Sequence, residues 1–194
     1  MPFIRPATLA DRDDIVNLHV RSWRENYANS LSEEFLSGDI EGNRREVWQS
    51  RLSEPNEKQY VLVAEIEGRF AGFACTRLDD DDELGTLVDN LHIEPDYRRC
   101  GVASHLLDET AKWVAENRPG QSIYLDVYEE NKRAQNYYKK IGGIFTTVEP
   151  FPVKAADGGY ASTYRVKWNT PQALLDATRQ EINRKMIPGS GTQD

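Results

Sequence analysis

The stretch RRCGVASHLL, residues 98–107, restricts the possible folds of this chain more than any other part of the sequence. It follows a strand-like run, TLVDNLHI, and opens a segment whose apolar residues recur every three or four positions. The chain therefore reads as a buried strand, a short loop and an amphipathic helix in direct succession. The unpaired amides and the dipole of a helix start favour an anion. Because Arg98, Arg99 and Gly101 add positive charge and an open backbone there, we expect a bound pyrophosphate, and with it a coenzyme.

The rest of the chain supports an α/β or α+β domain with a mixed sheet. Alternating or continuous apolar runs predict seven strands, over residues 3–8, 60–66, 70–78, 86–93, 122–128, 144–151 and 160–168. Helical spacing of apolar residues predicts five helices: up to about Trp23, before Pro55, from Val102, after Asn131 and over 171–187. A capping box at Thr8 and Asp11 supports the start of the first, and an N-cap at Asn131 supports the start of the fourth. Ligands of such sheets collect where strands end and helices begin.

Composition restricts the function classes. At 194 residues with 39% hydrophobic content, the chain suits one buried core rather than two full domains. A net charge of −8 disfavours a broad nucleic-acid-binding face and favours cationic small molecules or basic peptides. The N-terminal stretch has no long apolar run, so we expect a cytoplasmic protein that does not bind membranes. Cys75 and Cys100 lack metal or disulfide spacing, and the acidic run 79–83 reads as a solvated turn, so no metal is expected.

Three motifs, in the right order, resemble those of the GNAT superfamily of N-acyltransferases. The family's coenzyme-A loop, Q/R-x-x-G-x-G/A, is matched by residues 98–103, and NLHIEP before it resembles the family's fourth strand. LDVYEENKRAQNYYKKIGG resembles the second signature, in which Ala134 and Tyr138 follow Asn131 at three and seven positions and glycine comes soon after. The resemblance covers about residues 3–168. It implies one acetyltransferase domain with a mostly antiparallel sheet of about seven strands over 1–168, a helical extension over 169–187 and a disordered tail over 188–194.

The resemblance also implies how acetyl-CoA would be held. The amides of residues 99–104 would bind the pyrophosphate, and backbone groups of residues 91–93 would face the pantetheine arm and the acetyl carbonyl. Asn131 would bond the pantetheine arm, although a helix cap explains this residue equally well. The expected coenzyme-binding residues are Leu91, His92, Ile93, Arg98, Arg99, Cys100, Gly101, Val102, Ala103, Ser104, Asn131, Ala134, Tyr137 and Tyr138. Taken alone, the 98–103 stretch also fits a turn with solvated arginines.

Acetyl transfer to an amine requires a base and an acid. Deprotonating an alkylammonium of pKa 10.4 at pH 7 costs about 4.6 kcal/mol, so a carboxylate should take the proton. Asp126 matches a position where some family members carry a catalytic acidic residue, and Asp89 is the second candidate, but either could be a structural hydrogen-bond acceptor. Tyr138 matches the family's general acid, and the alternative for it is a core tyrosine. A covalent route through Cys100 is disfavoured, and His92 is more readily a packed residue than a base.

The acceptor is the least determined part of the reaction. The leading hypothesis is direct transfer of acetyl from acetyl-CoA to a primary amine of a small molecule or peptide in a ternary complex. The alternatives are an idle acyl-CoA-binding sensor or interaction module, and a transferase for a longer acyl chain or a hydroxyl acceptor. Aromatic residues that could line an acceptor pocket are Trp23, Tyr27, Phe35 and Tyr160. They do not separate a polyamine from an amino acid, and the oligomeric state, monomer or homodimer, stays open.

Overall fold

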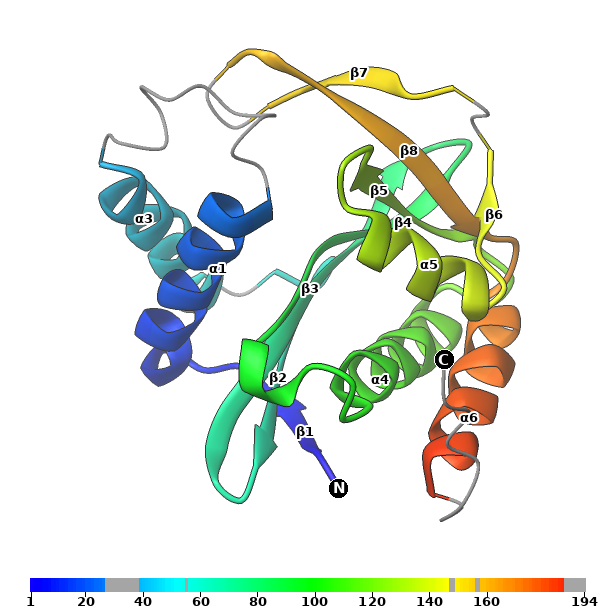
Figure 1. Ribbon diagram of the computed structural model, residues 1–194, viewed down its shortest axis with the longest axis horizontal. Coiled ribbons are helices and arrows are strands. Elements are labelled where there is room, and N and C mark those ends of the chain that lie inside the picture. The colour runs from blue at the N-terminus through cyan, green and yellow to red at the C-terminus, as the bar shows by residue number, and fades with distance from the viewer. Residues whose placement is uncertain (27–38, 55, 147–148, 156–157, 187–194) are drawn as a thin grey trace.

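The computed structural model describes residues 1–26, 39–54, 56–146, 149–155 and 158–186 (Figure 1). Within them, eight strands form one sheet in the order β1-β2-β3-β4-β5-β8-β6, and β7 pairs with β8. The strands are β1 (Phe3–Pro6), β2 (Gln59–Ile66), β3 (Arg69–Asp81), β4 (Gly85–Ile93), β5 (Ile123–Tyr128), β6 (Ile144–Phe145), β7 (Phe151–Lys154) and β8 (Tyr160–Trp168). The helices are α1 (Arg12–Asn26), α3 (Ile40–Ser53), α4 (Val102–Asn117), α5 (Lys132–Lys140) and α6 (Pro171–Met186), with short 3-10 turns at Leu9–Asp11 and Pro95–Tyr97.

The mixed, mostly antiparallel sheet expected from the sequence is confirmed. The pairing of β4 with β5 is parallel, and the other pairings along the sheet are antiparallel. One strand expectation is wrong: residues 144–151 do not form a single strand. Ile144–Phe145 and Phe151–Lys154 pair with different parts of the long strand β8, and Pro150 between them has no amide to give to a ladder.

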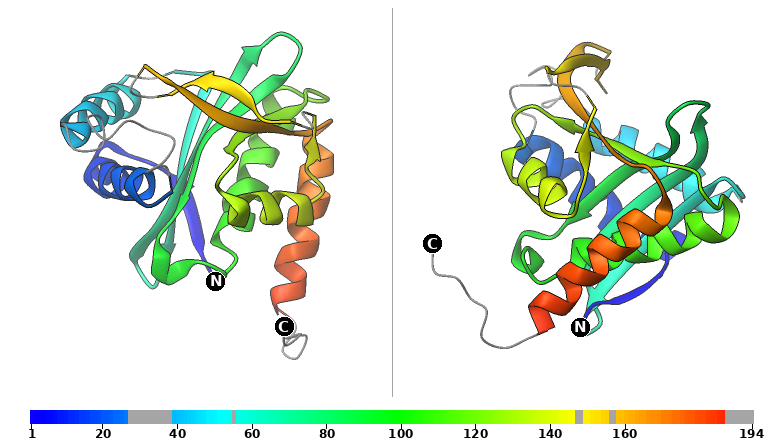
Figure 2. Two further views of the ribbon diagram at one scale, coloured as in Figure 1. Left: turned by 45° about the horizontal axis from the view of Figure 1, so that its top comes forward. Right: turned by 90° about the vertical axis from the view of Figure 1, so that its right-hand side faces the viewer.

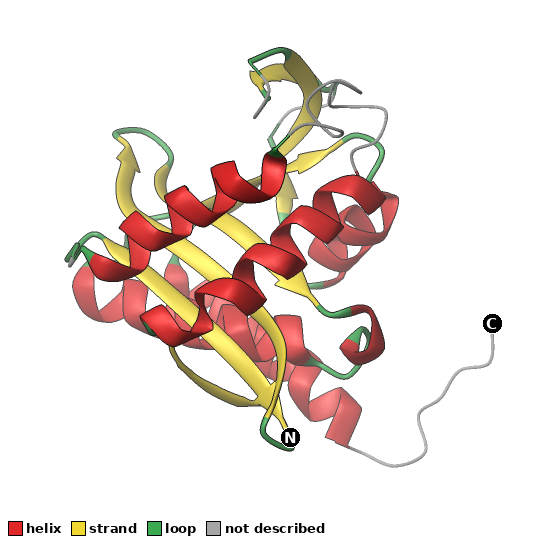
Figure 3. Ribbon diagram, turned by 90° about the vertical axis from the view of Figure 1, so that its left-hand side faces the viewer, coloured by secondary structure: helices red, strands yellow, loops and turns green. Residues whose placement is uncertain are grey.

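Helices cover both faces of the sheet, with α1 and α3 on one face and α4, α5 and α6 on the other (Figures 2 and 3). Strand β2 shows how the sequence fits this arrangement, because its successive side chains point to opposite faces. Val61 and Val63 pack in the cluster beneath α1 and α3, whereas Leu62 and Ala64 pack with the start of α4. A strand buried on both faces reads as a continuous apolar run.

Helix α6 lies along α4 and closes the second face of the sheet (Figure 2). Leu174 and Leu175 join the core cluster that contains Leu107 and Ala111. Helix α6 therefore packs on the core of the domain. The expected tail over 188–194 lies outside the described residues. No helix in the described ranges is long and apolar enough to cross a bilayer.

Candidate active site

The sheet opens between β4 and β5. The two strands run parallel, but their register contains only Thr86 with Ile123 and Leu87 with Tyr124. Beyond those pairs, β4 continues to Ile93 and bonds β3 on its other side, while β5 bonds β8. The facing backbone groups of the two strands are therefore available to a ligand. A cavity of about 1070 Å³ lies at this opening, within reach of both strands and of the starts of α4 and α5. Its volume is large enough for a drug-sized or cofactor-sized molecule.

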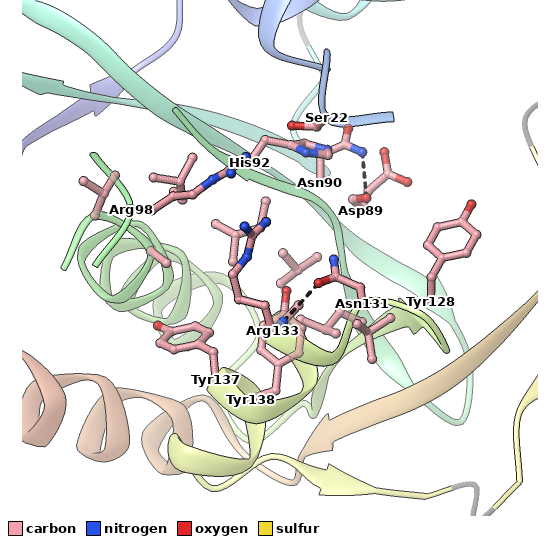
Figure 4. Close-up of a pocket in the computed structure, with 18 of the residues that line it drawn as sticks. Ser22, Asp89, Asn90, His92, Arg98, Tyr128, Asn131, Arg133, Tyr137 and Tyr138 are labelled. Carbon is pink, nitrogen blue, oxygen red and sulfur yellow. Dashed lines mark hydrogen bonds between the residues drawn. The ribbon is translucent and has the colours of Figure 1, made fainter. Parts of the chain in front are cut away.

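The cavity brings together nearly all the residues that the sequence singled out. Figure 4 shows Asp89, Asn90 and His92 from β4 on one side, with Tyr137 and Tyr138 from α5 on the other. The expected coenzyme-binding residues that line the cavity are Leu91, His92, Ile93, Arg98, Arg99, Gly101, Val102, Ala103, Ser104, Asn131, Ala134, Tyr137 and Tyr138, and the candidate carboxylates Asp89 and Asp126 line it as well. Cys100 is exposed and is not part of the lining. The roles assigned to these residues stay predictions.

The start of α4 has the backbone shape of an anion site. Gly101 is the N-cap and adopts the left-handed conformation, with φ +84°, which favours glycine. A Cβ added there would meet nothing closer than 3.8 Å, so the backbone conformation and not crowding requires glycine at this position. His105 donates the first helical hydrogen bond to the Gly101 carbonyl at 3.1 Å. The amides that precede His105 in the helix have no intrahelical acceptor and stay available to a ligand.

Positive charge surrounds this helix start. Arg98 pairs with Glu25 on α1 at 2.8 Å, and Arg99 is exposed. The Lys185 ammonium, from the last turn of α6, donates to the Arg99 carbonyl at 3.0 Å and also lines the cavity. Sequence reasoning gave α6 no part in the site, because only the packing of α6 on α4 brings Lys185 to this loop.

Helix α5 presents its first turn and two tyrosines to the cavity. Asn131 caps the helix as expected: its Oδ1 accepts from the Ala134 amide at 3.1 Å. The Tyr137 hydroxyl is hydrogen-bonded to the Ser104 hydroxyl at 3.0 Å. Tyr138 is buried against Trp168 and lines the cavity. Burial raises the pKa of Tyr138, so its hydroxyl stays protonated at neutral pH and can donate a proton.

Both candidate carboxylates are held by arginines. Asp126 accepts from Arg165 at 2.9 and 3.0 Å, a bidentate pair between neighbouring strands. Asp89 accepts from Arg51 of α3 at 2.7 Å. Each pair fixes the orientation of its carboxylate inside the cavity wall. The arrangement suits either a proton acceptor or a group that positions substrate, so the base assignment stays a prediction.

His19 of α1 and two arginines of α3 are the part of the site that the sequence did not predict. His19, Arg44 and Arg51 line the cavity, although no motif marked them. The available signal was a histidine within the apolar stripe of α1. His92 packs beside Phe73 and His19, with ring centroids at 5.2 and 4.9 Å, and burial lowers its pKa to about 4. Among the described residues, no cluster of three or more histidine, cysteine or acidic side chains could hold a metal.

The expected aromatic lining of an acceptor pocket is met in part. Trp23 lines the cavity. Tyr160 is 75% exposed and is not part of the lining, because it starts β8 ahead of the residues of that strand that pair with β5. Tyr27 and Phe35 lie outside the described residues.

Comparison with known proteins agrees with this geometry. The model of the acetyltransferase (GNAT) family matches residues 13–143. The chain is 29% identical over 167 residues to an N-alpha-acetyltransferase of Sulfurisphaera tokodaii, covering 80% of this chain and 86% of that protein. A GCN5-related N-acetyltransferase from Rhodopseudomonas palustris has a similar fold, with a TM-score of 0.66, 23% identity and coverage of 87% and 96%.

The PaiA N-acetyltransferase of Thermoplasma acidophilum, solved in complex with coenzyme A, has the same fold with a TM-score of 0.66, 19% identity and coverage of 87% and 99%. The family match extends over more than half of the chain and includes β4, the α4 loop and α5. The chain therefore belongs to the acetyltransferase (GNAT) family and is an acyl-CoA-dependent acetyltransferase.

Proposed function

We propose that the enzyme transfers the acetyl group of acetyl-CoA to a primary amine of a small molecule or peptide, by direct attack of the amine in a ternary complex. The observation that carries the proposal is the single cavity between the diverging ends of β4 and β5, which joins the start of α4 to Tyr138 and to two carboxylates. Because one cavity contains the coenzyme loop, Tyr138 and the candidate carboxylates, its layout supports direct attack without a covalent acyl-enzyme. The N-alpha-acetyltransferase named among the relatives supports an amine as acceptor.

The first task of the site is to hold the coenzyme. In this proposal the free amides of residues 101–104 and the nearby cations bind the pyrophosphate, since a helix N-terminus favours negative charge. Asn131 retains its capping bond to Ala134 and offers its side-chain amide group to the pantetheine arm. Cys100 is exposed outside the cavity lining, which supports leaving it out of the chemistry.

The second task is to stabilise the tetrahedral intermediate. The facing side of β4 beyond Leu87 has no β5 partner, so its backbone amides can donate to the acetyl oxygen. A donor of this kind contributes about 3 kcal/mol in enzymes where one has been removed. The proposal uses Leu91 to Ile93 in this role, because these residues line the cavity and follow the point where the strands part.

The third task is to move two protons. Asp126, or Asp89 in its place, accepts the proton of the amine directly or through water. Tyr138 donates a proton to the departing thiolate. Transfer from a tyrosine of ordinary pKa to a thiolate of pKa 8.5 is uphill by about 2 kcal/mol. The raised pKa of the buried Tyr138 increases this gap, so the hydroxyl must be hydrogen-bonded to the sulfur to act.

The test is a panel of acyl-CoAs crossed with an amine library and read by release of free thiol. Acetyl-CoA with at least one primary amine should give turnover. Tyr138→Phe should lower kcat by about 10²-fold, far more than it weakens coenzyme binding, whereas Tyr137→Phe, its neighbour, should keep most of kcat. Coenzyme binding without transfer to any amine, in a folded enzyme, would contradict the proposal and favour an idle binding module.

Two aspartate variants identify the base. Replacing the base by asparagine should lower kcat/KM by about 10²-fold or more and remove the acidic limb of its pH profile. Asp126→Asn and Asp89→Asn are compared under the same conditions, with Arg165→Gln added to the first to control for an unpaired arginine. An unchanged pH profile in both variants would exclude both residues.

A further inference from the structure

The cavity has an end beneath α1 and α3 that is distinct from the start of α4. We call it the acceptor end, and its lining includes His19, Trp23, Arg44, Arg51 and Asp89. We infer that the acceptor end binds a carboxylate, so that the amine acceptor is an amino acid or another amine that carries an acid group. This inference rests on the proposed function and names its substrate class.

The charges of the acceptor end do not cancel. Asp89 is bound by Arg51 at 2.7 Å and has Arg77 at 3.9 Å, so the positive side chains already match its charge. Arg44 has no carboxylate within ion-pair distance in the part of the chain that the structure describes. Its Nε and Nη2 both donate to the neutral Asn43 side chain, and its guanidinium lies 4.7 Å from the centre of the Trp23 ring. The positive charge of Arg44 is therefore left without an anion at ion-pair distance among the described residues.

The environment of Arg44 makes this excess charge costly. Burial, and to a lesser degree the positive charge of Arg51, lower the pKa of the Arg44 guanidinium, and the negative charge of Asp89 offsets only part of this effect. A cation–π contact with Trp23 offsets only part of the lost hydration. A guanidinium matches a carboxylate with two parallel hydrogen bonds, which is the usual way to satisfy an arginine in such a position.

His19 supplies an independent unpartnered donor. It is 1% exposed, and its Nδ1 accepts from the Trp48 indole N–H at 3.0 Å. Because an indole can only donate, Nδ1 carries no proton, and the proton of the neutral ring is on Nε2. Burial lowers the pKa of His19 well below 6.5, so the ring is neutral at pH 7. His19 Nε2 is buried and has no hydrogen-bond partner among the described residues.

The side chains of His19 and Arg44 can both be satisfied by the same kind of ligand group. The Nε2–H of His19 and the N–H groups of Arg44 are donors on residues that line the cavity, and no anionic oxygen of the described residues accepts from either. A carboxylate supplies acceptor oxygens and the missing negative charge together. A polyamine would instead add a second positive charge beside Arg44. The local charge thus separates acid-bearing amines from polyamines, although the net charge of −8 alone favours cations.

Binding of matched ligands to the enzyme saturated with coenzyme A tests the inference without relying on turnover. The probes are a panel of amino acids, the corresponding amino acid amides and spermidine, measured by calorimetry. We expect at least one amino acid to bind about 10–100-fold more tightly than its amide. Arg44→Gln should remove this preference, and Arg44→Lys should keep part of it because the charge remains.

Arg45→Gln is the matched control. Arg45 is the next residue of α3 and pairs with Asp13 and Glu41 at 2.6 and 3.0 Å on the outer side of the helix. This variant should retain the full preference for acids. Thermal unfolding of each variant checks that it is folded.

The outcomes separate this inference from the proposed function. Amides or spermidine that bind as tightly as the acids, no binding of any acid, or a preference that survives Arg44→Gln would overturn the inference. Acids that bind in the expected way but are never acetylated would keep the inference and refute the proposed function. Acetyl transfer confined to amines without an acid group would keep the proposed function and refute the inference.

Discussion

Replacing Gly101 by asparagine or aspartate separates the effect of the left-handed backbone at the start of α4 from the effect of charge at the same position. Both residues tolerate the left-handed φ of +84° better than other L residues, and an added Cβ would meet no atom closer than 3.8 Å. The two variants should therefore have similar stability, about 1 kcal/mol below the wild type. They differ in one negative charge, placed where the proposal puts the pyrophosphate.

The size of the charge effect follows from Coulomb's law. An aspartate about 5 Å from a phosphate charge costs about 3 kcal/mol at an effective dielectric constant of 20. Solvent at the open end of the cavity reduces this figure, so about 1.5–3 kcal/mol is expected, or about 10–150-fold in affinity. Salt should weaken the effect, since exposed charges are screened over about 10 Å at 0.1 M ionic strength.

Calorimetric titration of coenzyme A into both variants measures this difference. Gly101→Asp should bind about 10–150-fold more weakly than Gly101→Asn at 0.05 M salt, and the ratio should shrink at 0.5 M salt. Equal affinities of the two folded variants at low salt would refute the assignment of this helix start to the coenzyme phosphates.

Three further predictions follow from single contacts. Gly143→Ala should lower the unfolding free energy by about 1–3 kcal/mol, because its Cβ would lie 2.5 Å from Val166 Cγ1, and an unchanged Tm would contradict this packing. The pKa of His92 is about 4 in the fold and 6.5 when exposed, so the folded state loses stability as pH falls from 6.5 toward 4. In denaturant unfolding, His92→Gln should lose less unfolding free energy than the wild type between pH 6.5 and 4. The same pH dependence in both proteins would count against a buried neutral ring. Lys185→Ala should weaken coenzyme A binding by about 3–10-fold at low salt, because its ammonium, bonded to the Arg99 carbonyl, lines the cavity, and unchanged calorimetric affinity would exclude α6 from the site.

The regular elements could be predicted because their signals are local. The apolar spacing from Val102 and the cap at Asn131 gave α4 and α5, and both are present. The break between β6 and β7 could not be found in this way. Both segments are apolar enough for one strand, and their separation depends on how each pairs with β8, about 20 residues and 10 residues further along the chain.

The candidate site also has a part that local sequence signals predict and a part that only the fold assembles. The coenzyme loop was found because its residues are adjacent in sequence. Trp23 and Asp89 of the acceptor end were expected, but His19, Arg44 and Arg51 were missed, because the acceptor end combines α1, α3 and β4, which only the sheet brings together. His19 reads as one member of an apolar stripe, and its unpartnered Nε2 becomes visible only when Trp48 is seen to occupy Nδ1.

A crystal structure of the enzyme with coenzyme A tests the central claim most directly. The account predicts the pyrophosphate on the amides of residues 101–104 and the thiol between β4 and β5, within hydrogen-bond distance of the Tyr138 hydroxyl. A coenzyme bound elsewhere, or one whose thiol points away from Tyr138 toward solvent, would contradict it.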